Sequence, residues 1–190
     1  MHRREFLKVS VAGSLGTLLP AQALASDLAA GREISFECLG AVAGPRFLDG
    51  RTGNGTVGLV PDLRPAFSGT RWRVYNAGPG AFGFKCMGSV EGSRWLDGHT
   101  QDGSVGLAPN YRPPFTGTRW QAVSDSASPS IVTLRCLGNI EGPRFLDGRT
   151  GNGTVGLAAN TAPPFSGTRW RIASYPVQID SGTNLVPADH

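Results

Sequence analysis

The chain has 190 residues and a formal net charge of +4, and it contains 27 glycines and 14 prolines. This length suits a single domain with a substantial hydrophobic core. The charge does not indicate a nucleic-acid-binding protein, because three of the cations, Arg3, Arg4 and Lys8, belong to an N-terminal segment with the features of a targeting peptide.

Residues 1–25 have the pattern of an export signal peptide. Basic residues come first, Val9 to Leu19 form a short apolar run, and Ala23-Leu24-Ala25 supplies the small residues of a cleavage site. The alternative, an N-terminal membrane anchor, is disfavoured because spanning a bilayer takes roughly 20 apolar residues. Cleavage after Ala25 would leave 165 residues with a formal charge of +2 and no membrane span.

The start of this segment resembles the twin-arginine export signal. The resemblance rests on Arg3-Arg4 followed by Glu5-Phe6-Leu7-Lys8. It implies that the chain folds before export, and we therefore expect a periplasmic or secreted protein.

After an expected linker over residues 26–33, the chain repeats itself three times. The sequence at 44–50 returns at 92–98 and at 142–148, so the copies are offset by 48 and 50 residues. We expect the repeats to cover residues 34–80, 81–129 and 130–175. Residues 176–190 are expected to form a flexible C-terminal tail.

Each repeat is predicted to hold four short strands. In the first copy they are expected around residues 36–39, 46–49, 56–60 and 71–75, where β-branched and aromatic residues are bounded by Gly, Pro and Asn. Asn54-Gly55 and its equivalents indicate hairpin turns. Helix is not expected, because apolar residues do not recur at helical spacing between residues 34 and 175.

Three units of four strands favour a β-trefoil over a propeller, because propellers use at least about four blades. In the trefoil pattern, six strands form a short barrel and six hairpin strands cap it. The closed arrangement leaves no large exposed sheet edge. The predicted fold is therefore an all-β trefoil with three internal repeats of about 48–50 residues and four strands in each.

Alternation along the first strand of each repeat assigns one face to the core. We expect that core to be filled by Phe36, Phe84 and Leu134 together with the repeated tryptophans. The repeat also places one cysteine on this face of each copy, at Cys38, Cys86 and Cys136. They are interpreted as buried thiols, since free cysteine packs as a small hydrophobe. The alternative is that a threefold axis gathers them as metal ligands, although their spacing matches no zinc pattern; no cofactor is expected.

A repeated aspartate supplies the candidate site. Asp49, Asp97 and Asp147 stand where a strand meets a turn, and each is followed in that turn by a second polar residue: Asn54, Asp102 or Asn152. Carboxylates and amides suit sugar hydroxyls because they form hydrogen bonds with them. Alternatively, the aspartates cap their turns and pair with repeated arginines as structural ions. The arginines considered are Arg46, Arg94 and Arg144, or Arg71, Arg119 and Arg169.

The order Phe-Leu-Asp-Gly, Asn-Gly-Thr-Val-Gly-Leu and Thr-Arg-Trp resembles the ricin-type lectin repeat over residues 34–175. It is also similar to the fascin-like trefoil repeat. The lectin resemblance implies that Asp49, Asp97 and Asp147 occupy the sugar-binding position of that family. The aromatic platform that usually follows Val-Gly-Leu in that family is replaced here by Val60, Ala108 and Ala158. The nearest aromatic candidates are Tyr111, Phe67, Phe115 and Phe165.

These observations predict an exported, non-catalytic, lectin-like protein with up to three equivalent weak sites for glycans or polysaccharide. An enzyme is not expected. Of the three histidines, His2 lies in the signal segment and His190 is the last residue, so His99 has no catalytic partner set, and Glu91 and Glu141 have no counterpart in the first repeat. The alternative is a trefoil that binds an envelope protein through its loops, as an inhibitor or a scaffold. Nucleic acid is not an expected partner.

Overall fold

A computed structural model describes residues 28–175 of the chain. The predicted signal peptide and C-terminal tail, residues 1–25 and 176–190, lie outside the described residues. Within residues 28–175, no helix is long and apolar enough to cross a membrane.

The described chain is all-β, as the sequence predicts, and its strands form one twelve-stranded antiparallel sheet. The first repeat holds β1 (Glu33–Cys38), β2 (Phe47–Arg51), β3 (Thr56–Val60) and β4 (Trp72–Gly78). The second holds β5 (Ala81–Cys86), β6 (Trp95–His99), β7 (Ser104–Ala108) and β8 (Trp120–Asp125). The third holds β9 (Ser128–Cys136), β10 (Phe145–Arg149), β11 (Thr154–Ala158) and β12 (Trp170–Ser174).

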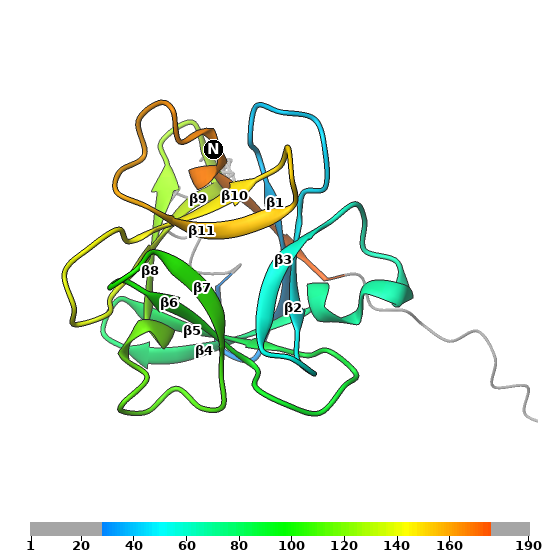
Figure 1. The fold of residues 1–190 in the computed structure, drawn as a ribbon, viewed down its shortest axis with the longest axis vertical. Helices are drawn as coiled ribbons and strands as arrows, with labels where there is room; N and C mark the ends of the chain where they lie inside the picture. The colour runs from blue at the N-terminus through cyan, green and yellow to red at the C-terminus, as the bar shows by residue number, and fades with distance from the viewer. Residues whose placement is uncertain (1–27, 176–190) are drawn as a thin grey trace, which may run out of the picture.

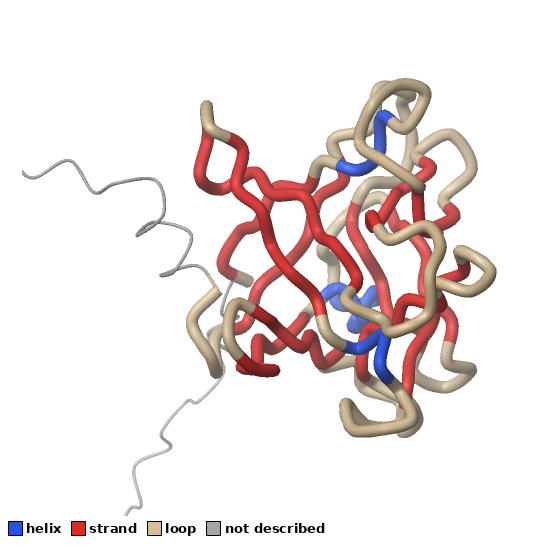
Figure 2. The backbone as a smooth tube through the Cα atoms, turned by 90° about the vertical axis from the view of Figure 1, so that its left-hand side faces the viewer, coloured by secondary structure: helices blue, strands red, loops and turns tan. Residues whose placement is uncertain are grey.

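Within residues 28–175 the helical features are three short 3₁₀ turns, which the sequence pattern did not predict. They are η1 (Pro65–Thr70), η2 (Thr116–Thr118) and η3 (Ser166–Thr168), and each precedes the last strand of its repeat. Figure 2 shows them as short segments among the loops and strands of the body. In the first, the Thr70 hydroxyl donates to the Phe67 carbonyl at 2.8 Å, a local bond that closes the turn.

Six strands pair in a closed ring. In order around it, β1 pairs with β4, β4 with β5, β5 with β8, β8 with β9, β9 with β12, and β12 with β1 again. Each of the six therefore has a partner on both sides. The first and last strands of each repeat supply this barrel, so all three repeats are needed to close it.

The other six strands form three hairpins, β2–β3, β6–β7 and β10–β11. Their second strands, β3, β7 and β11, lie around a common centre in Figure 1. There β3 pairs with both β7 and β11, and the Leu157 amide donates to the Gly103 carbonyl at 2.8 Å, joining β11 to the hairpin turn of the second repeat. The three hairpins thus form one layer across an end of the barrel.

The core lies inside the barrel, and the predicted residues fill it. Trp72, Trp120 and Trp170 are fully buried, and their indole N–H groups donate to the Leu48, Leu96 and Leu146 carbonyls at 3.0, 2.9 and 2.9 Å. Phe36 and Phe84 meet edge to face, with ring centroids 5.0 Å apart. Leu28, in the segment expected to be a linker, is also buried.

The three cysteines are free and buried, each in its own repeat interface. The Cys86 thiol donates to the Gly50 and Gly69 carbonyls at 3.3 and 3.5 Å, and Cys38 and Cys136 make equivalent bonds. Burial raises the pKa of Cys86 and Cys136 to about 11. In the part of the chain that the structure describes, no three cysteine, histidine or acidic side chains are arranged to hold a metal ion.

A glycine in each first hairpin strand makes room for these thiols. At Gly98, a Cβ atom would lie 2.9 Å from the Cys136 sulfur and 3.0 Å from Cη2 of Trp120. Gly50 and Gly148 are equally crowded. The repeated Asp-Gly pair thus has a glycine because sulfur and indole pack directly beneath the strand.

Replacing Gly98 with Ala should lower the free energy of unfolding by about 1–3 kcal/mol, because the added methyl overpacks the core. The measurement is urea unfolding of the wild type, Gly98→Ala, Cys136→Ala and the double variant. Removing the sulfur gives part of the space back, so the double variant should lose less stability than the two single losses combined. Strictly additive losses would contradict this packing.

Candidate functional site

Three equivalent hollows lie on the surface, one in each repeat. Each is bounded by the hairpin and the 3₁₀ turn of one repeat and by a loop of the next. Hollow 1 contains Asp49, Arg51, Asn54, Ser68 and Val90; hollow 2 contains Asp97, His99, Asp102, Thr116 and Ile140; hollow 3 contains Asp147, Arg149, Asn152, Ser166 and Val42. Their volumes are about 320, 450 and 230 Å³ respectively.

The strand pleat places the aspartate at the base of each hollow. In β6, Leu96 and Gly98 face the core, so Asp97 and His99 face outward. The η2 turn then packs over Asp97: a Cβ atom on Gly117 would lie 2.1 Å from the Gly98 carbonyl oxygen and 2.5 Å from Oδ1 of Asp97. A glycine at 117 is therefore required for the turn to close against the carboxylate.

This packing leaves the aspartates nearly covered, with exposed fractions of 7, 5 and 6% for Asp49, Asp97 and Asp147. Burial raises the pKa of each carboxyl above its ordinary value, while the neighbouring Arg51, His99 or Arg149 lowers it. For Asp147 the Gly167 backbone also lowers the pKa by hydrogen bonding. An ionised carboxylate at the base of a hollow is thus partly deprived of water, which strengthens its tendency to accept hydrogen bonds.

The arginines predicted to pair with the aspartates do not do so. The partner is instead the residue two positions later, because residues i and i+2 share one face of a strand. Nε of Arg51 lies 3.9 Å from Oδ2 of Asp49, and Arg149 and Asp147 repeat this distance. In hollow 2, Nε2 of His99 lies 3.2 Å from Oδ2 of Asp97.

Most of the arginines that were expected to pair with the aspartates instead bind loop carbonyls or other acidic side chains. Nη1 of Arg46 donates to the carbonyls of Cys38 and Gly40 at 3.0 and 2.9 Å, and Nη2 donates to Val42 at 3.2 Å. Arg94 and Arg144 hold the equivalent loops in the same way. In the other set, Arg71 pairs with Glu33 at 3.5 Å and Arg169 with Asp125 at 2.6 Å.

The second predicted residue of each site does line its hollow, but its oxygen is already used. Oδ1 of Asn54 accepts from the Thr56 amide and hydroxyl at 3.1 and 2.8 Å, and Asn152 does the same with Thr154. Oδ1 of Asp102 accepts from the Ser104 amide at 2.9 Å. These oxygens fix the hairpin turn, a local bond typical of Asn and Asp at turns.

Tyr111 does not line hollow 2. Its ring packs on Trp95, with centroids 4.5 Å apart, and Trp95 is packed in turn against Tyr75 at 4.8 Å. Tyr111 keeps 39% of its surface exposed. Among the other aromatic candidates, Phe67 lines hollow 1 and Phe115 lines hollow 2.

Sequence reasoning missed the residue that each hollow takes from the next repeat. Val90, Ile140 and Val42 are 58, 49 and 58% exposed, although they are aliphatic. Their carbonyls accept hydrogen bonds from Thr52, Thr100 and Thr150, at 2.6, 2.7 and 2.6 Å. The signal was an aliphatic residue that recurs at the centre of a Gly-x-x-x-Gly loop in every copy.

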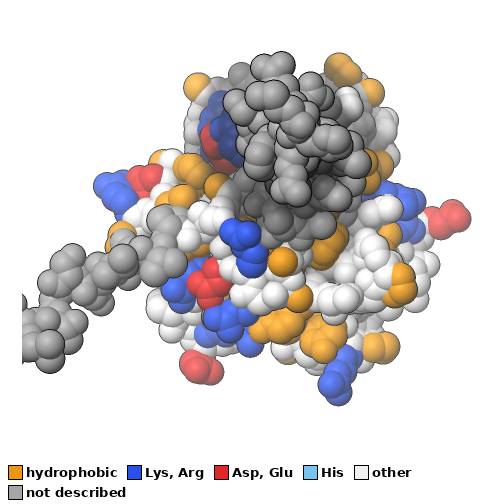
Figure 3. Space-filling model, turned by 180° about the vertical axis from the view of Figure 1, so that it is seen from behind, with side chains coloured by type: hydrophobic (Ala, Val, Ile, Leu, Met, Phe, Trp, Pro, Cys, Tyr) orange, Lys and Arg blue, Asp and Glu red, His pale blue; other side chains and the backbone are white. Residues whose placement is uncertain are grey.

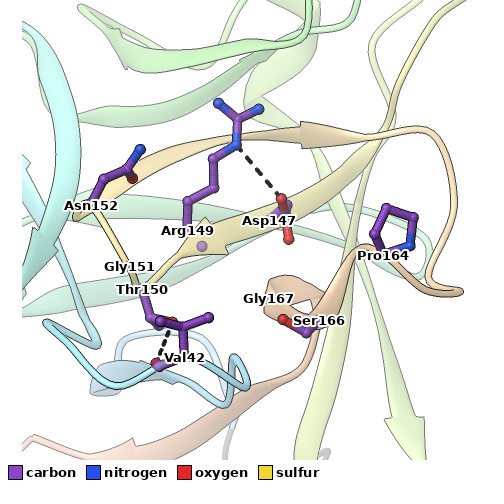
Figure 4. A pocket seen from close by; sticks show the side chains of 10 residues that line it. Val42, Asp147, Arg149, Thr150, Gly151, Asn152, Pro164, Ser166 and Gly167 are labelled. Carbon is purple, nitrogen blue, oxygen red and sulfur yellow. Dashed lines mark hydrogen bonds and ion pairs between the residues drawn. The ribbon is translucent and has the colours of Figure 1, made fainter.

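Hollow 3 illustrates the arrangement. In Figure 4 the Arg149 side chain extends from the strand beside Asp147, and Val42 and Thr150 lie at another edge with their hydrogen bond drawn. Each hollow thus combines a buried acceptor, a cationic or imidazole group next to it, and an exposed aliphatic side chain.

Comparison with known proteins gives structural neighbours only. No protein-family model and no curated protein matches the chain. The structure of SeviL bound to asialo-GM1 saccharide matches with a TM-score of 0.55 and 12% identity, covering 77% of this chain and 99% of that one. A salivary protein from Culex quiquefasciatus, of the Cysteine and Tryptophan-Rich (CWRC) family, matches with a TM-score of 0.53 and 15% identity over 76% and 94%. The shared feature is the all-β fold.

The raised pKa of the aspartates has a consequence for stability. The carboxyl groups of the folded chain bind protons more tightly than those of the unfolded chain. The free energy of unfolding therefore falls as the pH rises from about 4, the ordinary pKa of aspartate, through the raised pKa of the folded state. The Asp49→Asn/Asp97→Asn/Asp147→Asn variant keeps the shape and removes the charge. At pH 7 it should be as stable as the wild type or more stable, by the order of 1 kcal/mol.

Urea unfolding at pH 7 and at pH 4 measures this difference, and any advantage of the triple variant should shrink at the lower pH. A loss of several kcal/mol at pH 7 would instead show that the aspartates are structural ions on which the fold depends.

Proposed function

We propose that the chain is a β-trefoil that binds carbohydrate, without catalysing a reaction, through its three hollows. The observation that carries this proposal is the nearly buried carboxylate at the base of every hollow. An ion pair of 3.9 Å is too long for a hydrogen bond, so Asp49 and Asp147 gain little from their arginines. An aspartate is nevertheless present at this position in all three repeats, as expected of a group that binds a ligand.

The trefoil assignment is supported by the strand pairing. The closed ring of six strands and the layer of three hairpins agree with the pattern expected for that fold. Each strand of the ring comes from the first or last strand of a repeat, and each hairpin from the middle two.

The chemistry of the hollows suits a sugar. A carboxylate accepts bonds from neighbouring hydroxyls, and the exposed aliphatic side chain offers a surface for the C–H groups of a ring. SeviL, which shares the fold, is bound to a saccharide in its structure. Because the hollows are shallow, each site should bind weakly, and a polysaccharide that reaches several sites would gain by avidity.

Export by the twin-arginine route, to the periplasm or beyond, belongs to the same proposal. Its support is the sequence of residues 1–25 together with three free, buried thiols. A chain that folds before export encloses its thiols before it meets an oxidising compartment. On the face in Figure 3, Lys and Arg side chains lie singly or beside acidic ones, which favours a neutral or mixed partner over nucleic acid.

A second candidate function is binding of an envelope protein. The observation that favours it is the set of exposed aliphatic side chains, Val42, Val90, Val123 and Ile140. Exposed apolar groups are common at protein interfaces, although single ones also occur on ordinary surfaces.

A glycan array probed with the purified protein separates the two functions. The wild type should bind a subset of glycans. The Asp49→Asn/Asp97→Asn/Asp147→Asn variant should lose at least about tenfold in affinity, because hydrogen bonds to charged acceptors contribute roughly 1.5–3 kcal/mol each.

The matched control is Asp62→Asn/Asp125→Asn, which removes two partly buried acids outside the hollows and should bind as the wild type does. Correctly folded protein that binds no glycan would contradict the proposal and favour the protein-binding function. Glycan binding that survives the triple change would place the sugar elsewhere.

A further inference from the structure

The three hollows are not chemically equal, because the residue beside the aspartate changes. Hollows 1 and 3 have Arg51 and Arg149 at this position, and hollow 2 has His99. The turn residue changes with it, from Asn54 and Asn152 to Asp102. Hollow 2 therefore holds two carboxylates and an imidazole but no guanidinium, while each of the others holds one carboxylate and one guanidinium.

The guanidinium groups of Arg51 and Arg149 lie beside the hairpin strands and are accessible to a ligand. The side chains of Arg51 and Arg149 are 54 and 57% exposed. Each lies across a glycine of the facing strand: a Cβ atom at Gly58 would be 3.0 Å from Nη2 of Arg51, and one at Gly156 would be 3.2 Å from Nη2 of Arg149. The glycine makes room for the guanidinium beside the strand.

Among residues 28–175, the Nη nitrogens of Arg51 and Arg149 form no hydrogen bond. The one polar contact of each side chain with these residues is the 3.9 Å approach of Nε to the aspartate. Arg46, in contrast, donates to three carbonyls. The Nη donors of Arg51 and Arg149 therefore form an open fork, which matches the two oxygens of a carboxylate.

We propose that hollows 1 and 3 select saccharides that carry a carboxylate, namely uronate residues, and that hollow 2 takes neutral residues. This inference rests on the proposed carbohydrate function. In a hexuronate ring the carboxylate on C5 is adjacent to the hydroxyl on C4. The buried Asp49 or Asp147 accepts the hydroxyl, and the neighbouring guanidinium binds the carboxylate.

Hollow 2 keeps the buried aspartate but lacks the open guanidinium that would bind an acid. The two ring nitrogens of His99 are engaged, Nε2 with Asp97 at 3.2 Å and Nδ1 with the Ser104 hydroxyl at 2.9 Å. Two carboxylates, Asp97 and Asp102, line this hollow, and both repel a carboxylate. Hollow 2 is also the largest of the three, which leaves room for an uncharged sugar ring.

The test is calorimetric titration of the purified protein with a short oligogalacturonate, whose non-reducing terminal residue has a free C4 hydroxyl, and with its carboxyl-reduced form, in which each carboxylate is replaced by CH₂OH. The wild type should bind the acidic oligosaccharide at two sites, at least tenfold more tightly than those sites bind the reduced form. Arg51→Gln/Arg149→Gln should lose at least tenfold in affinity for the acid, so that the acidic and reduced forms bind with similar affinity. Both side chains are more than half exposed, and urea unfolding confirms that the variant is folded.

The reciprocal variant, His99→Arg/Asp102→Asn, gives hollow 2 the chemistry of the other two and should raise the number of acid-binding sites from two to three. Equal affinity of the wild type for acidic and reduced forms would overturn the inference while leaving carbohydrate binding intact. Acid binding that survives Arg51→Gln/Arg149→Gln would overturn it as well. Failure to bind either oligosaccharide, with no glycan bound on the array, would overturn the proposed function and this inference together.

Discussion

The contact between a glycine, a cysteine sulfur and a tryptophan ring determines the rest of this structure. Gly98 lies against Cys136 and Trp120, and the same triplet recurs at the other two repeat interfaces. Because Gly98 has no side chain, the strand can approach the core closely, and the indole of Trp120 can reach the carbonyl of Leu96. The alternation of the strand then directs Asp97 outward. The position of the site is therefore a consequence of core packing.

The hollows depend on closure of the ring of repeats as well. Each one takes its aspartate from one repeat and its aliphatic side chain from the next, and the third repeat borrows Val42 from the first. The threonine hydroxyls that bind the loop carbonyls join the same neighbours. One repeat alone would have neither a complete barrel nor a complete hollow, so folding and site formation are coupled.

The sequence predicted what repetition and alternation encode. The all-β architecture, the hairpin turns and the buried tryptophans follow from patterns that recur at 48 and 50 residues. The partners of the arginines could not be predicted in this way, because the carbonyls held by Arg46 become acceptors only once the loop has folded. The pairing of Arg51 with Asp49 could have been predicted, since residues i and i+2 share a face of a strand. The place of Val90 in hollow 1 could not, because its contact with the first repeat exists only in the closed ring.

Differences between the repeats were harder to interpret than similarities. Tyr111 was expected beside the sugar, yet it packs on Trp95, the one position of the three where tryptophan replaces phenylalanine. From the sequence, His99 was used only to argue against catalysis. In the structure, His99 and Asp102 line hollow 2 where an arginine and an asparagine line the other two hollows. Where copies of one scaffold diverge at a surface hollow, the divergence is informative about ligands.

A crystal structure of the protein with a bound oligosaccharide tests the central claim most directly. We expect sugar in at least one hollow, with a ring hydroxyl within hydrogen-bonding distance of Asp49, Asp97 or Asp147 and a ring face against Val90, Ile140 or Val42. Sugar bound elsewhere, for example on the exposed ring of Tyr111, with all three carboxylates left without a ligand, would contradict it.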